Sequence, residues 1–460
     1  MSDRLTADKK ALLIATCVAS ITTPLMSTMM NLSLLDIGTD FNVGSHAQAY
    51  VNTMFLLGSV VSMVPSAKFA SVYGMKRVFK FGLFLVMIFC LLSFLSPSFG
   101  FLIIMRFLIG TATAMTAVTS MAMLTYSFPL TVRGRVLGFN TTFVYLGLSL
   151  GPTIGGVITD LLGWRFIFIF VLCLAAIALS AILAFNQEIV PTPENRMDWI
   201  GAVMWGVMII CTMFGFVNIT AVWGPPLFAL GIILLIFNWK YLRDAKDPVL
   251  NTKMFRNPVF SRSCIAAFMN YGASYCITFF LSLYLQSIGE LSATEAGGLL
   301  LIQPFMQVLL TTKMGTISDH MVDKRILPCI GMVITLIGVS MYLFMSTEYS
   351  VLYVVAIMIV TGVGLGIFGA PNNSLIMSSA PMNMKGEASG VLAVVRQTGM
   401  MISMGVAMAS LSIIMGSTDN LGPDTYGLFI NALHLTFGIC VVMCAIGAIC
   451  SSIKVKTELN

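Results

Sequence analysis

The chain has 460 residues, of which 58% are hydrophobic and only 10% are charged, whereas about 25% of the residues of a typical soluble domain are charged. This composition excludes a soluble enzyme and indicates a membrane-spanning protein. The net charge of +6 does not indicate a nucleic-acid partner, because no basic stretch is interleaved with aromatic residues.

Apolar segments of about twenty residues recur along the chain, and this length crosses about 30 Å of hydrocarbon at 1.5 Å per helical residue. The first segment is too long for a signal-peptide core, so we expect it to remain as a helix. The sequence predicts fourteen transmembrane helices, at residues 12–35, 49–70, 78–96, 101–124, 135–159, 164–185, 199–220, 225–242, 262–287, 295–314, 326–346, 351–376, 388–414 and 428–452.

Basic residues divide the loops into two sets, and short cytoplasmic loops are the ones enriched in Lys and Arg. One set, to which both chain ends belong, holds almost all of these residues, and the other set has only Arg165 nearby. The sequence therefore predicts a multi-pass protein of the cell membrane with both termini in the cytoplasm.

Two loop patterns each occur twice in the chain, at nearly equal offsets. The pattern of Pro, basic residue and glycines in 129–138 recurs in 381–390, and the pattern in 71–77 recurs in 319–325. Parallel repeats of this kind predict two six-helix bundles with a substrate path between them. We expect an all-α membrane protein with three parts: an N-terminal bundle at 1–187, an inserted helix pair with a cytoplasmic linker at 188–258, and a C-terminal bundle at 259–460.

Ten cysteines are scattered mostly through the apolar segments, without a CxxC pair or a matching histidine cluster. We therefore expect reduced thiols, no metal site and no cofactor. The sequence also lacks a P-loop of the GxxxxGK[ST] type, so we expect gradients rather than ATP hydrolysis to drive any work.

Glycines follow one face of the fifth predicted helix, in the string formed by Gly147, Gly151, Pro152, Gly155 and Gly156. Such a face lets another helix backbone approach closely, and the proline bends the helix because it removes a backbone donor. Helix packing by itself accounts for glycines of this kind. The full string GxxxGPxxGG, however, resembles the antiporter motif of the major facilitator superfamily.

Further segments resemble the fourteen-helix drug:proton antiporter branch of that superfamily, which includes the tetracycline efflux proteins of Gram-positive bacteria. In the fourth-helix motif RxxQGxGA, Ile109 and Ala112 replace the expected Gln and Gly. The segments that carry the resemblance are 102–114 with Arg106 and Gly110, 163–165 (GWR), 248–260 (PVLNTKMFRNPVF), 284–286 (YLQ), 292–297 (SATEAG) and 396–399 (RQTG).

The resemblance implies a major facilitator fold and a secondary active transporter without enzymatic activity. It implies the export of small amphipathic compounds, such as drugs, in exchange for protons, by a monomer in the lipid bilayer. An importer or facilitator of a metabolite with the same fold remains an alternative. A transporter-like sensor or a membrane-embedded enzyme is a further alternative, but no predicted loop is long enough or chemically equipped for it.

The sequence departs from the branch where carboxylates are expected. The loop motif has Ser71 in place of Asp, and its second copy keeps Asp319 but has Val322 in place of Gly. The first helix has Met26 at the start of the expected Asp-x-Thr-x-x-Asn string, which ends at Asn31. The carboxylate that would exchange a proton there is missing.

Proton antiport needs an ionisable group that both sides of the membrane reach in turn. The nearest carboxylates, Asp36, Asp160 and Glu295, lie at outer helix ends. His434 is the only histidine within a predicted span, and an unperturbed pKa of about 6.5 suits a proton carrier. The alternative for His434 is a packing role supported by a hydrogen bond.

Two arginines, Arg106 and Arg396, lie roughly 8 and 12 Å inside their predicted spans. A charge at such depth is costly unless it faces water or a partner. We expect both to line or brace the central cavity, although Arg106 has the alternative of extending to the membrane surface.

Polar side chains on the predicted cavity helices complete the candidate site, with bridging between neighbouring helices as their alternative role. They are Thr28, Asn31, Thr113, Thr116, Asn140, Tyr145, Asn270, Tyr271, Gln303 and Gln307. The 34 methionines and 32 phenylalanines suit an adaptable apolar wall, although methionine is also common membrane filler.

The two copies of the loop motif predict a cytoplasmic gate. Asp319 can accept charge-assisted hydrogen bonds close to Arg325, whereas Ser71 offers only a neutral hydroxyl. The alternative is that both loops are solvated turns. The predicted gate residues are Ser71, Gly74, Lys76, Arg77, Asp319 and Arg325.

Overall fold

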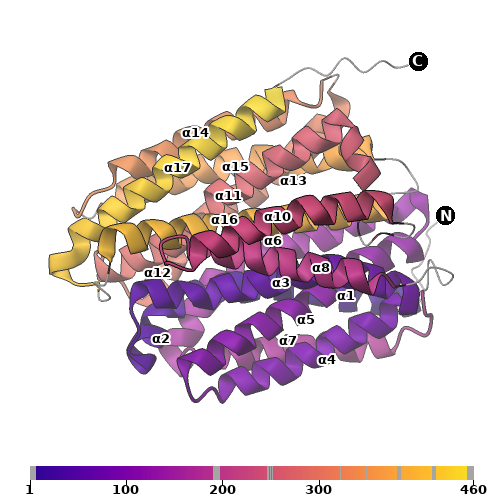
Figure 1. Ribbon diagram of the computed structural model, residues 1–460, viewed down its shortest axis with the longest axis horizontal. Coiled ribbons are helices and arrows are strands. Elements are labelled where there is room, and N and C mark those ends of the chain that lie inside the picture. The colour runs from indigo at the N-terminus through magenta and orange to yellow at the C-terminus, as the bar shows by residue number, and fades with distance from the viewer. Residues whose placement is uncertain are drawn as a thin grey trace.

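The computed structural model describes residues 7–189, 197–245, 248, 250, 252–321, 323–348, 350–380, 385–416 and 421–452. Every regular element in these ranges is a helix (Figure 1). The first part of the chain forms α1 (Ala7–Thr28), η1 (Met29–Ser33), α2 (Leu34–Phe41), α3 (Ser45–Tyr73), α4 (Met75–Phe94), α5 (Phe99–Ser127), α6 (Leu130–Leu162) and α7 (Phe166–Leu183).

The middle and last parts of the chain continue this helical pattern. The middle part forms α8 (Trp199–Ile209), the π-helix η2 (Ile210–Phe214), α9 (Gly215–Val217) and α10 (Gly224–Asp244). The last part forms η3 (Thr252–Arg256), α11 (Pro258–Ser287), α12 (Ala293–Leu300), α13 (Ile302–His320), α14 (Ile326–Met341), η4 (Tyr342–Phe344), α15 (Val351–Ser379), α16 (Lys385–Met415), η6 (Pro423–Thr425) and α17 (Tyr426–Ser452).

The described helices confirm the prediction of fourteen membrane spans. Thirteen helices are long and apolar enough to cross a membrane, and the two bent parts of α6, Thr142–Leu148 and Leu150–Leu162, form a fourteenth span. The bend of 43° lies just before Pro152, which has no N–H for the carbonyl of Leu148. Most of the helices extend past the predicted bounds, because their polar ends continue the same hydrogen-bonding pattern, whereas the sixth span, Phe166–Leu183, lies within its predicted bounds of 164–185.

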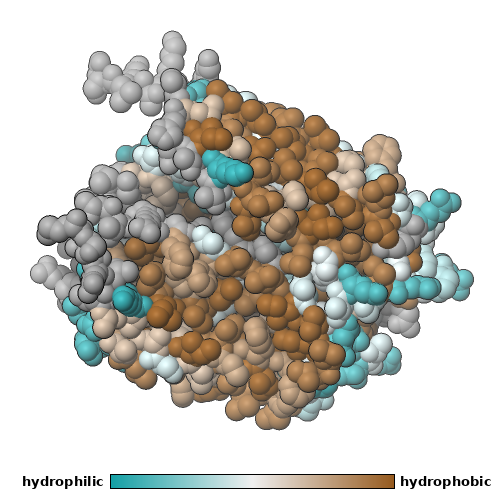
Figure 2. Space-filling model, turned by 180° about the vertical axis from the view of Figure 1, so that it is seen from behind, coloured by the Kyte–Doolittle hydropathy of each residue, from teal (hydrophilic) through white to brown (hydrophobic). Residues whose placement is uncertain are grey.

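The spans form two groups that lie one above the other in Figure 1, with α1–α7 below and α11–α17 above. We call these the N-bundle and the C-bundle. The start of α1 and the end of α17 lie at the same end of the molecule. Figure 2 shows hydrophobic side chains across the middle of one face and hydrophilic ones gathered toward its ends, which is the pattern of a protein surrounded by lipid.

The helix pair α8–α10 packs across the outside of both bundles. The indole Nε1 of Trp205 donates to the carbonyl of Val60 in α3 at 3.2 Å. The hydroxyls of Thr220, just after α9, and Ser412 in α16 lie 2.8 Å apart. The pair therefore contacts the N-bundle through α3 and the C-bundle through α16.

The two ends of the molecule differ in charge and in how the bundles meet. The basic end holds the loops at 74–77 and 323–325, and the far end holds the turns at 42–44 and 288–292. Four hydrogen bonds between described residues join the bundles, and all four lie in the half of the spans nearer the far end. They are Thr53 to Met408, Thr153 to Gly297, Tyr275 to Ser27, and Thr294 to Asp160.

Candidate functional site

The glycine face of α6 packs against α1 within the N-bundle. A Cβ atom on Gly147 would lie 2.7 Å from the carbonyl oxygen of Ile21, and one on Gly155 would lie 2.5 Å from that of Met29. Real Cβ atoms do not approach other atoms this closely, so these positions require glycine. The glycines therefore let the two helix backbones pack in direct contact.

The same part of α6 also meets α12 of the C-bundle. A Cβ on Gly156 would overlap the carbonyl oxygen of Ala293, and a Cβ on Gly297 would lie 3.1 Å from the carbonyl oxygen of Pro152. Nearby, the hydroxyl of Thr153 donates to the carbonyl of Gly297 at 3.0 Å. The predicted antiporter motif thus lies where the two bundles touch at the far end.

Arg106 on α5 is completely buried. Its Nε donates to the carbonyl of Val51 in α3 at 2.9 Å, and both Nη atoms lie 3.3 Å from the carbonyl oxygen of Met26 in α1. The guanidinium carbon also lies 4.7 Å from the centre of the Phe55 ring. The burial rules out extension to the membrane surface, and the contacts show that Arg106 braces α1 and α3 against α5.

Tyr275 on α11 joins this arrangement from the other bundle, and the sequence analysis missed it. Its hydroxyl donates to the carbonyl of Ser27 at 3.0 Å, one residue after the carbonyl that Arg106 holds. Arg106 and Tyr275 therefore meet the same turn of α1 from the two bundles. A tyrosine in a long apolar helix has no sequence signal that identifies such a contact.

Three predicted cavity asparagines are buried and bond to side chains of their own bundle. This arrangement corresponds to the alternative role of bridging neighbouring helices. Asn52 donates to Asn31 at 2.6 Å, Ser20 donates to Asn140 at 3.0 Å, and Asn270 donates to the sulfur of Met332 at 3.2 Å.

The remaining predicted cavity residues differ in exposure. Arg396 and Tyr271 are half-buried, and Gln303 is buried. The amide nitrogen of Gln397, next to Arg396, is buried without a hydrogen-bond partner among the described residues. The side chain of Tyr145 lies outside the described part of the chain. Gln397 therefore places one unsatisfied donor among the described residues on α16, next to the charge of Arg396.

His434 on α17 has a hydrogen-bond partner at the outer side of the C-bundle. Its Nε2 lies 2.8 Å from the carbonyl oxygen of Met345, just after η4. This contact ties α17 to the end of α14, so the geometry favours the packing role.

The first predicted gate loop is bound by a carboxylate from elsewhere in the chain that the sequence analysis did not identify. Glu188, after α7, accepts a hydrogen bond from the backbone N–H of Lys76 at 2.8 Å and lies 3.8 Å from the guanidinium of Arg77. It therefore caps the start of α4. Ser71 instead donates to the carbonyl of Lys68 in its own helix at 2.8 Å.

The turn before α4 leaves room for this carboxylate. Gly74 has a φ angle of +110°, and a Cβ there would lie 2.7 Å from Oε1 of Glu188. The ammonium group of Lys76 donates to the carbonyl of Phe185 in the same segment. The loop is therefore held by the chain after α7.

In the second gate loop, Arg325 binds Asp323. Its Nε and Nη2 donate to the two carboxylate oxygens at 2.8 and 2.9 Å. This hydrogen bonding raises the pKa of the Arg325 guanidinium above its ordinary value, so Arg325 keeps its charge. The side chain of Asp319, which we expected to be the acceptor there, lies outside the described part of the chain.

The sequence matches a known family and several known transporters. The family described as Major Facilitator Superfamily matches residues 13–404. The riboflavin transporter RibZ of Clostridioides difficile (strain 630) is 25% identical over 447 residues, which cover 96% of each chain. Multidrug resistance protein 3 of Bacillus subtilis (strain 168) is 24% identical over 405 residues, which cover 85% of this chain and 77% of that protein.

Solved structures show the same fold. A POT family transporter in complex with 5-aminolevulinic acid superposes with a TM-score of 0.72 at 15% sequence identity, and the match covers 95% of this chain and 94% of that one. The family match, the fourteen spans and this shared fold agree. The chain belongs to the major facilitator superfamily, whose members carry small molecules across the lipid bilayer and are not enzymes.

Proposed function

We propose that this transporter exports small amphipathic compounds, including drugs, across the cell membrane by alternating access, in exchange for protons. The observation that carries the proposal is the position of the contacts between the bundles. All four hydrogen bonds that join them among the described residues lie toward the far end. The path between the bundles would then be closed at the far end and open toward the basic end.

The charge of the loops supports the interpretation that this state is open toward the cytoplasm. Short loops rich in Lys and Arg face the cytoplasm, so the basic end and both termini would be cytoplasmic. Substrate would enter from the cytoplasm or the inner leaflet and leave after the bundles separate at the contact between α6 and α12. Because that contact is made largely by backbone atoms and glycines, few side chains need to rearrange when it opens.

Apolar burial would supply the affinity for substrate. The many Met and Phe side chains suit substrates of different shapes, and relatives named as multidrug resistance proteins agree with this substrate class. A relative named as a riboflavin transporter favours a second candidate function, the transport of a metabolite with a planar aromatic ring.

Asp160 contributes a charged acceptor to the far-end contact. Its carboxylate accepts the backbone N–H of Thr294 in α12 at 2.7 Å. A hydrogen bond to a charged acceptor is worth about 1.5–3 kcal/mol, against about 0.5–1.5 kcal/mol for a neutral one. Replacement of the carboxylate by a neutral acceptor would therefore weaken the closed far end and favour the state that is open there.

A transport assay in everted membrane vesicles tests the proposal. With an acidic interior, vesicles that contain the protein should accumulate a fluorescent amphipathic cation such as ethidium, and dissipation of the pH gradient should release it. Asp160→Asn keeps an oxygen acceptor but lacks the charge, so it should weaken the far-end contact and change the rate of transport.

Three results of this assay would contradict parts of the proposal. Equilibration of the cation independent of the gradient would indicate a facilitator. Saturable transport of riboflavin without transport of ethidium would favour the second candidate function. An unchanged rate of transport in Asp160→Asn would remove the Asp160 contact from the transport cycle.

The bracing by Arg106 predicts a separation between folding and transport. Arg106→Met keeps most of the side-chain volume and removes a buried charge, so we expect the stability in detergent to change by less than about 1.5 kcal/mol. Transport should fall at least about tenfold, because Met lacks the planar guanidinium that donates to the carbonyls of Val51 and Met26. Arg243→Met, at an exposed position of α10, is the matched control, and wild-type transport by Arg106→Met would contradict the role.

Cysteine labelling tests the proposed orientation. In a variant without the native cysteines, Ser350→Cys should react with an impermeant thiol reagent applied to intact cells, and Asn251→Cys should react only after the cells are opened. The charge asymmetry of the loops is the physical reason. Labelling of Asn251→Cys from outside would reverse the orientation.

A further inference from the structure

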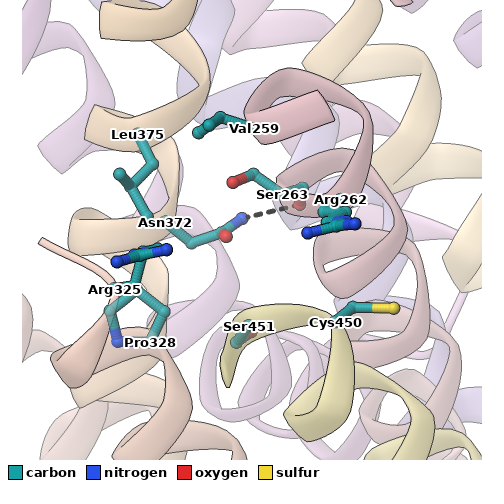
Figure 3. A pocket seen from close by; sticks show the side chains of 9 residues that line it. All are labelled: Val259, Arg262, Ser263, Arg325, Pro328, Asn372, Leu375, Cys450 and Ser451. Atoms are coloured by element: carbon teal, nitrogen blue, oxygen red, sulfur yellow. Dashed lines mark hydrogen bonds between the residues drawn. The ribbon is translucent and has the colours of Figure 1, made fainter. Parts of the chain in front are cut away.

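A small cavity lies inside the C-bundle at the basic end, away from the contact between the bundles. It is formed by the first turns of α11 and α14 and the last turns of α15 and α17 (Figure 3). The cavity has a volume of about 20 Å³, whereas pockets for drug-sized ligands have about 300–1,000 Å³. It therefore suits one small polar group and is not the transport path.

Two arginines face this cavity. Figure 3 shows Arg262 and Arg325 on opposite sides of Asn372. The Nη1 atom of Arg262 is buried and has no hydrogen-bond partner among the described residues. A buried guanidinium donor without an acceptor is costly, so this donor, which no described residue uses, favours the binding of an acceptor in the cavity.

Asp323 offsets only part of this positive charge. Its carboxylate binds Arg325 at 2.8 and 2.9 Å, and Arg262 forms no ion pair with another described residue. The four helix ends around the cavity are two N-terminal and two C-terminal ends, so their dipoles largely cancel. The local field is therefore set by the guanidinium groups and favours an anion.

Asn372 adds a further donor. One N–H of its side-chain amide donates to the carbonyl of Ser263 at 3.1 Å, and this bond fixes the orientation of the amide. The side chain is 1% exposed, so the position of its second N–H is also fixed. Asn372 and Arg262 together provide directed donors, which is the chemistry that recognises phosphate oxygens.

Exposed apolar side chains occur on α14 and α17, two of the helices whose end turns line the cavity. Ile326 and Ile330 in the first turns of α14 are each 44% exposed, and Ile446 and Ile449 in the last turns of α17 are 40% and 59% exposed. These two helices pack against each other. Ile326 and Ile449 follow and precede in sequence the lining residues Arg325 and Cys450, so the same helix ends carry both the cavity and exposed apolar side chains.

We propose that this cavity binds the phosphate group of an anionic membrane lipid, with the acyl chains lying along α14 and α17. Phosphate oxygens would accept hydrogen bonds from Arg262 and Asn372, and the adjacent apolar surface distinguishes a lipid from a free phosphate ion. A basic pocket between transmembrane helices at a bilayer surface has the chemistry that binds such headgroups. The inference does not depend on the direction of transport or on the transported compound.

Lipid binding to the purified, delipidated protein tests this site. Native mass spectrometry would measure binding of dioleoylphosphatidylglycerol, with dioleoylphosphatidylcholine and inorganic phosphate as separate probes. We expect Arg262→Gln to bind phosphatidylglycerol about tenfold more weakly than the wild type, the factor for loss of one charge-assisted hydrogen bond. Arg243→Gln removes the same charge at an exposed position of the same end and should bind like the wild type.

The probes distinguish the possible sources of the phosphate. Phosphatidylcholine should bind more weakly than phosphatidylglycerol, because its choline cation lies beside the arginines. Inorganic phosphate should displace phosphatidylglycerol only at a much higher concentration. Equal binding of phosphatidylglycerol by Arg262→Gln and wild type would overturn the site, and displacement by inorganic phosphate at comparable concentrations would overturn the lipid assignment.

Discussion

The close approach of α6 to two different partners is the constraint on which the rest of the structure depends. One set of its glycines holds the backbone of α1 within the N-bundle, and Gly156 holds the backbone of α12 in the C-bundle. The first contact belongs to the fold of one bundle, whereas the second must break if the bundles are to separate. The same part of the helix therefore contributes both to the stability of the fold and to the proposed transport cycle, and the bend just before Pro152 lies within it.

Arg106 and Tyr275 show how the two bundles share one turn of α1. The guanidinium is buried among carbonyls and the ring of Phe55, so its position is fixed. Tyr275 reaches the neighbouring carbonyl from α11. Movement of the bundles would change the surroundings of the arginine without moving Arg106 within its own bundle. A buried charge in that position responds strongly to such a change, because the low dielectric of the interior screens it little.

The sequence predicted the helices well and their contacts less well, for physical reasons. Fourteen spans follow from hydrophobicity and length alone, and the antiporter glycines were found because close backbone packing requires glycine. The partners of Arg106 are backbone carbonyls, which every residue has, so no residue type indicated them. Glu188 became the cap of α4 because the chain after α7 returns to that loop, a tertiary contact that local spacing does not reveal.

The most direct test of the account measures whether the bundles separate at α6 and α12. Leu161, in the last turn of α6, and Leu352, in the first turn of α15, are both exposed. Spin labels at these two positions would report the distance by pulsed electron paramagnetic resonance. Leu161 with Leu95 is the control pair within the N-bundle. The account predicts that Gly156→Ala lengthens the Leu161–Leu352 distance, whereas Gly298→Ala, which meets nothing within 4 Å, leaves it unchanged. An identical distance distribution in Gly156→Ala and the wild type would contradict the account.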